Sequence, residues 1–168
     1  MFLPSKDPSA AMYFVYALSG IVFLYAIYRG LFTKLKTPQD YVDRAKSYVS
    51  FFRYHKKAIR ILEQGLALPN LEKRDEQELH FRLGIQFFRL RDFSKATKHF
   101  DHVLPRLKNK KLEFDKGYLD MIMSYYNDQQ EVTARKIYHQ LLSKQHVDPR
   151  FGIVTTLDSR IFKDARNK

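Results

Sequence analysis

Residues 83–100 read LGIQFFRLRDFSKATKHF, and this stretch decides the fold. Leu83 and Phe87 are four residues apart, as on one face of a helix, and Ala96 and Phe100 repeat that spacing after an Arg-Asp turn. The stretch therefore predicts two helices joined by a short turn. A residue as small as Ala96 indicates where the two helices approach each other closely.

The same pattern recurs on both sides of this stretch with a step of 38 residues. Ala96 has counterparts at Ala58 and Ala134, and four more aligned columns of apolar or small residues keep the same step. Those columns are Ala45, Leu83 and Met121; Val49, Phe87 and Tyr125; Leu62, Phe100 and Tyr138; and Gly65, Val103 and Leu141. A fixed period of this size is typical of stacked helix pairs. We expect three units, at about residues 39–76, 77–114 and 115–147.

Local signals place the ends of several helices. Thr37-Pro38-Gln39-Asp40 combines an N-cap, a proline at the first helical position and an acidic third position, and it predicts that a helix begins here. Pro69-Asn70 predicts the end of the second helix of the first unit. The run from Asp128 to Glu131 predicts another capped helix start in the third unit.

The middle unit resembles the tetratricopeptide repeat. The matching residues are the Leu83-Gly84 pair, the aromatics Phe87, Phe93 and Phe100, and the small Ala96. The third unit keeps Tyr125, Ala134 and Tyr138, the first keeps Ala58, and the period of 38 exceeds the usual ~34. The resemblance implies an all-α solenoid over residues 37–147 that binds protein partners in a groove lined by the first helix of each unit. The groove residues that it implies are Phe81, Ile85, Phe88, Arg89, Leu119, Met123, Tyr126 and Asn127.

Residues 148–168 predict one more helix and a tail. Asp148-Pro149 begins it, and Phe151, Val154, Leu157 and Ile161 follow at spacings of three and four. A solenoid needs its terminal face covered, so we expect this helix to cap the last unit. The alternative is that it fills the groove and that the groove residues are core.

Residues 10–28 predict a transmembrane helix. They form 19 consecutive uncharged residues, which as a helix span roughly 28 Å, close to the thickness of a bilayer core. A signal peptide would carry a positive start and small residues before its cleavage site, and a buried core helix would keep a polar stripe. Neither alternative fits this stretch as well as a membrane span does.

The flanks of the span predict its orientation. Only Lys6 and Asp7 are charged before it, whereas the basic linker 29–36 and the helix after it are rich in Lys and Arg. The positive-inside rule then places residues 1–9 outside and the rest in the cytoplasm. We expect a single-pass protein whose helical part adapts or scaffolds protein partners at the cytoplasmic face of a membrane.

The chain carries 30 Lys and Arg against 18 Asp and Glu, a formal net charge of +12. Such a surface attracts acidic partners, so the alternative function is a basic domain that binds anionic lipid headgroups or, less favoured, nucleic acid. The densest basic run is Lys108, Lys110, Lys111 and Lys116, and it is the candidate patch for that function. Phosphate contacts would weaken steeply with salt.

Catalytic and metal chemistry finds little support in the sequence. There is no cysteine, which excludes disulfides and thiolate chemistry, and no glycine-rich phosphate loop. His99 and His102 stand one helical turn apart, but zinc needs further ligands and no second pair has matching spacing. We therefore predict no enzyme, no metal site and no cofactor.

Overall fold

The computed structural model describes residues 10–32 and 34–161, and within them every regular element is a helix. The prediction of an all-helical chain is confirmed for these residues. The predicted N-terminal tail 1–9 and the residues after 161 lie outside the described part. The elements in chain order are α1 (Ala10–Phe32), α2 (Pro38–Phe52), α3 (His55–Leu66), α4 (Lys73–Arg89), α5 (Phe93–Asp101), the 3₁₀ helix η1 (Leu104–Lys108), α6 (Gly117–Asn127), α7 (Glu131–Leu142), the 3₁₀ helix η2 (Pro149–Leu157) and α8 (Asp158–Ile161).

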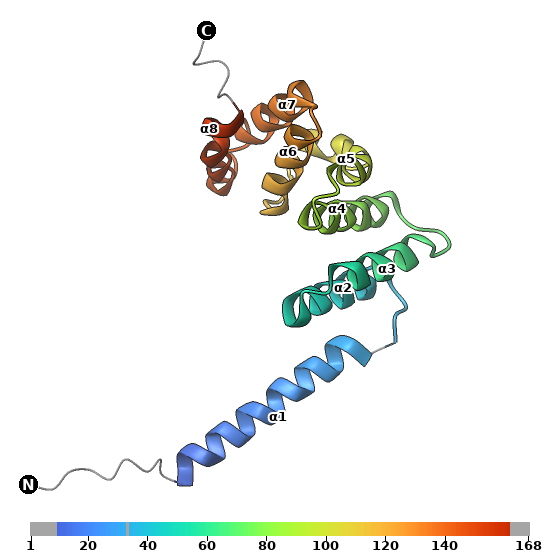
Figure 1. Cartoon of the computed structure of the whole chain (residues 1–168), viewed down its shortest axis with the longest axis vertical. Helices are drawn as coiled ribbons and strands as arrows, with labels where there is room; N and C mark the ends of the chain where they lie inside the picture. Colours follow the sequence, from blue (N-terminus) through green and yellow to red (C-terminus); the bar gives the residue numbers. More distant parts are fainter. Residues whose placement is uncertain (1–9, 33, 162–168) are drawn as a thin grey trace, which may run out of the picture.

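Helix α1 is long and apolar enough to cross a membrane. Its stretch Met12–Arg29 has a mean hydropathy of 1.4 over 18 residues, and none of it is buried in the protein. Figure 1 shows α1 projecting away from the other helices, with α2 beside it. The helix continues to Phe32, four residues beyond the predicted span.

The helices after α1 pack as successive antiparallel pairs. The pairs α2–α3, α4–α5 and α6–α7 contact internally, and α3–α4 and α5–α6 join one pair to the next (Figure 1). The five aligned columns explain this packing, because fourteen of their fifteen residues are buried and Val49 is half-buried. The repeat period therefore marks the core of the protein.

Close packing of α4 and α5 depends on a glycine. A Cβ placed on Gly84 would lie 2.6–2.7 Å from three ring atoms of Phe100, well inside normal contact distance. Phe100 itself is completely buried. The Leu83-Gly84 pair thus lets the aromatic ring of one helix lie directly against the backbone of the other.

The structure tests three of the predicted helix boundaries. Thr37 and Asp40 form the predicted capping box at the start of α2. Asn70, with φ at 58°, lies in the turn that follows α3, as predicted. The predicted cap at Asp128 is wrong, because Gln130 is the N-cap of α7 and Asp128 ends α6. The Asp128 carboxylate accepts instead from the hydroxyl of Thr97 at 2.9 Å, which ties α6 to α5.

The C-terminal segment folds as the 3₁₀ helix η2 followed by the short α8, rather than as one α-helix. Its four spaced apolar residues are nevertheless all buried: Phe151, Val154, Leu157 and Ile161. The segment packs on α7, and Tyr138 of α7 donates a hydrogen bond to Asp158. The apolar face of the last pair is therefore covered.

Candidate functional site

The predicted groove residues fall into two groups in the structure. Phe81 and Met123 are buried, and the Phe81 ring lies 6.0 Å from the Phe100 ring and 5.0 Å from the Tyr118 ring, measured between centroids. Phe151 of η2 extends this aromatic stack, 6.3 Å from Tyr118. At this end the predicted groove face is therefore part of the core.

The other group lies where α4 and α6 end. Phe88 and Tyr126 are half-buried, Arg89 and Asn127 are exposed, and Ile85 and Leu119 are half-buried between the two groups. A cleft of about 490 Å³ opens here, and we call it the α4–α6 cleft. Its lining residues are Phe88, Arg89, Arg91, Phe93 and Asn127.

Contacts within the cleft fix its aromatic and cationic groups. The Arg89 guanidinium donates to the Asp120 carboxylate on α6 at 2.8 Å and lies 5.7 Å from the centre of the Phe88 ring. The Phe88 and Phe93 rings are 5.8 Å apart. Burial raises the pKa of the Asp120 carboxyl, and the adjacent Arg89 opposes that rise. The cleft thus presents two aromatic rings beside the Arg89–Asp120 ion pair, an arrangement that suits an apolar or aromatic side chain of a partner.

The sequence prediction missed Arg91 and Phe93 as cleft residues. Arg91 ends the turn after α4 with φ at 60°, and Phe93 begins α5, so the turn folds both back beside Phe88. Arg91 and Phe93 follow Phe88 by three and five residues, and this closeness in sequence could have indicated that they line the same cleft. The family resemblance implies groove residues on the first helix of each unit only, whereas Arg91 and Phe93 lie after α4.

The candidate basic patch lies on the connection between α5 and α6. Lys108, Lys110, Lys111 and Lys116 are all exposed. Asp115, in the same connection, forms an ion pair with Arg82 of α4 at 2.8 Å. The connection therefore carries the acidic residues Glu113 and Asp115 beside its four lysines, and its surface is not of a single charge.

Three histidines that are scattered in sequence gather between α4 and α5. The rings of His80 and His102 are stacked, 3.8 Å apart and within 3° of parallel. His80 Nδ1 lies 2.9 Å from His99 Nδ1, and the ring of Phe87 stacks on His99. Sequence analysis paired His99 with His102 and missed His80, because the contact crosses from one helix to the next.

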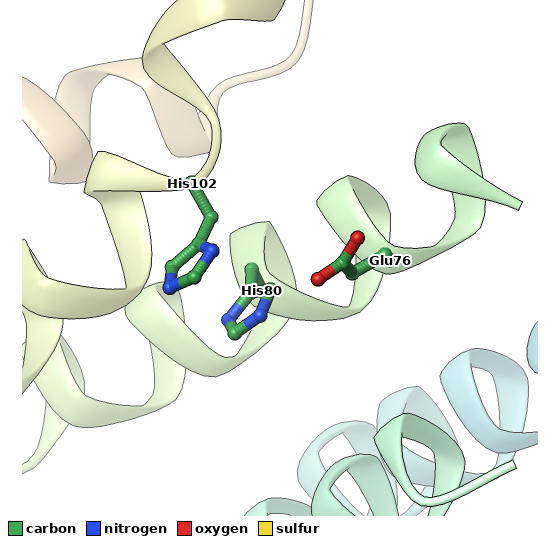
Figure 2. A group of neighbouring side chains, drawn as sticks. All are labelled: Glu76, His80 and His102. Carbon is green, nitrogen blue, oxygen red and sulfur yellow. The ribbon is translucent and has the colours of Figure 1, made fainter. Parts of the chain in front are cut away.

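Glu76 completes this cluster, as Figure 2 shows. One ligand atom from each of Glu76, His80 and His102 lies within 4.8 Å of the others, close to the separations in a metal site. Stacked parallel rings, however, do not aim their nitrogen lone pairs at one point. Burial and the two neighbouring histidines lower the pKa of His80 to about 4, and burial and His102 lower that of His99. The buried environment therefore favours the neutral imidazole at His80 and at His99.

The chain matches no protein-family model, and no curated protein or solved structure is significantly similar to it.

Proposed function

We propose that this protein is a membrane-tethered adaptor, similar to tetratricopeptide-repeat proteins, that recruits a protein partner through the α4–α6 cleft. The observation that carries the proposal is the cleft itself, where Phe88, Phe93 and Arg89 converge from two helices. Aromatic and arginine side chains contribute most of the binding energy at protein interfaces. The partner should pack an apolar or aromatic side chain against the two rings and place a carboxylate near Arg91.

Attachment to a membrane would increase the fraction of partner that a small cleft can hold. In this proposal α1 spans the bilayer and α2–α8 lie on the cytoplasmic side, as the excess of Lys and Arg after the span favours. A partner in or on the same membrane would be held at a high effective concentration, so a contact of micromolar affinity would suffice for recruitment.

The C-terminal segment supports an open cleft. The ring contacts of Phe151 are with Phe114 and Tyr118, toward the end of the face that is already core. This arrangement supports the capping role for residues 148–161 and leaves the Phe88 end accessible.

Site-specific photocrosslinking in native membranes tests the proposal. A photoreactive amino acid at Asn127 should give a discrete adduct, and the same group at Val132 of α7, which is 83% exposed, should not. Phe88→Ala should abolish the Asn127 adduct without changing the helical circular dichroism spectrum. Equal crosslinking from both positions, or an adduct that survives Phe88→Ala, would refute the cleft as the recruitment site.

A further inference from the structure

The turn between α2 and α3 carries an exposed aromatic cluster beside the apolar helix. Phe51, Phe52 and Tyr54 expose 39%, 40% and 56% of their surface. Their rings contact one another in sequence, with Phe51 and Phe52 6.3 Å apart and Phe52 stacked on Tyr54 at 5.5 Å. Exposed aromatic clusters of this kind are unfavourable in water and favourable at a membrane interface.

A ring contact sets the depth of this cluster relative to α1. The Phe51 ring lies 6.0 Å from the ring of Phe23, edge to face. Phe23 precedes Arg29, the first cation after the span, by six residues, which is roughly 9 Å along a helix. When α1 spans a bilayer with Arg29 at the headgroup boundary, Phe51 therefore lies about 9 Å deeper than Arg29, among the acyl chains next to the headgroups.

The same turn opens into a basic cavity of about 780 Å³ between α2 and α3. Five of its twelve lining residues are Lys or Arg, and none of the twelve is Asp or Glu. The five cations are Arg44, Arg53, Lys56, Lys57 and Arg60. Three aliphatic residues, two tyrosines, His55 and Gln64 line the remainder, and the ring of Tyr48 lies 4.4 Å from Lys57 Nζ.

The local charge agrees with an anionic occupant. Residues 29–66 contain nine Lys and Arg against three Asp and Glu, so half of the net charge of +12 lies in this part of the chain. Of the three acids, Asp40 is held in the capping box of α2 and Asp43 pairs with Lys46 at 3.6 Å. The cavity therefore faces a field that favours phosphate.

We infer that the α2–α3 turn is a second membrane contact, which inserts Phe51, Phe52 and Tyr54 at the interface and receives the phosphate of an anionic phospholipid in the basic cavity. The occupant is a lipid rather than a soluble anion, because the cavity shares Tyr54 with an aromatic cluster that reaches the acyl chains. The inference rests on the proposed span of α1. Its consequence is that the helical domain is held in one orientation on the membrane instead of swinging freely on a tether.

The absence of tryptophan from the chain permits a direct test. Full-length Phe51→Trp, Phe14→Trp and Val132→Trp each carry a single tryptophan, which is excited selectively at about 295 nm, and are reconstituted in vesicles with brominated acyl chains. Phe14 is in α1 and reports the span, whereas Val132 on α7 reports solvent. We expect bromine to quench Phe51→Trp and Phe14→Trp several-fold more than Val132→Trp. Quenching of Phe14→Trp alone would overturn the second contact and leave the span standing, and quenching of neither would refute the span itself.

Headgroup selectivity is tested on Phe51→Trp in detergent micelles by titration with short-chain phosphatidylglycerol. Each Lys or Arg near an anionic lipid contributes about a factor of five in affinity, so Arg53→Gln/Lys56→Gln/Lys57→Gln should raise the apparent Kd at least about tenfold. The matched control, Lys108→Gln/Lys110→Gln/Lys111→Gln, removes the same charge from the other basic run and should leave the Kd unchanged. An equal response to short-chain phosphatidylcholine or to inorganic phosphate would overturn the lipid assignment, as would equal effects of the two triple variants.

Discussion

Substitution of Gly84 by alanine tests the packing that defines the middle helix pair. The new methyl group would lie 2.6–2.7 Å from three atoms of the Phe100 ring, about 1 Å closer than a normal carbon contact. Phe100 is fully buried and its ring also packs near Phe81, so it has little room to move. Three contacts this short place the overpacking cost at the upper end of the usual range, about 2–3 kcal/mol, whereas alanine in a helix gains about 1 kcal/mol over glycine. The steric term prevails.

We expect Gly84→Ala to lower the stability of the helical domain by about 1–2 kcal/mol and its melting temperature by about 3–10 °C. Thermal unfolding of the full chain in micelles, followed by circular dichroism, measures this. Gly20→Ala is the matched control, because no heavy atom lies within 4 Å of its added Cβ and the melting temperature should not change. In the background of Phe100→Leu, which removes most of the ring, Gly84→Ala should be neutral or stabilising. A Gly84→Ala protein as stable as the wild type would refute the close α4–α5 contact.

Three further predictions concern single interactions. Acidification from pH 6.5 to about 4 should destabilise the protein by about 1–3 kcal/mol, because unfolded His80 binds a proton over most of this range while native His80 stays neutral. His80→Phe keeps the stacked ring and should flatten this pH dependence in thermal melts. An unchanged pH dependence in His80→Phe would contradict the assignment to His80. Thr37→Ala removes the hydroxyl that accepts from the Asp40 N–H at 3.3 Å and should cost about 1 kcal/mol, while Thr37→Ser should cost little; equal losses would rule out the cap. Tyr125→Phe removes the hydroxyl that donates to the Asp101 carboxylate at 2.7 Å and should lower stability by about 1 kcal/mol in the same thermal assay. An unchanged melting temperature would show that this hydrogen bond does not stabilise the fold.

Sequence periodicity predicted the core well because burial imposes a residue type at each repeated position. Ala58, Ala96 and Ala134 are all fully buried, as a period of close helix approaches requires. Signals contained within one helical turn could also be predicted from the sequence, such as the capping box of Thr37 and Asp40. The 3₁₀ form of η2 was not, since residues spaced by three and four fit either helix type.

The candidate sites were harder to predict because each brings together residues from different elements. The histidine cluster depends on His80 of α4 meeting His102 at the end of α5, a contact that no local spacing encodes. The basic cavity is lined by residues of α2, of α3 and of the turn between them, and its cations are spread from Arg44 to Arg60. The sequence instead indicated the run from Lys108 to Lys116, because lysines that are close in sequence can be recognised there, whereas cations that are close only in the folded structure cannot.

The order in which the helices contact one another has a consequence for synthesis. Each of α3 to α7 packs against the element immediately before it or one close by in the chain. Contacts between near neighbours close short loops, so a pair can fold as soon as its second helix leaves the ribosome. Because α1 precedes α2 and α3, a membrane that takes up α1 in the proposed span would receive it while α2 and α3 are still emerging. We therefore expect assembly to proceed outward from the bilayer, pair by pair, with each finished pair serving as the surface on which the next one folds.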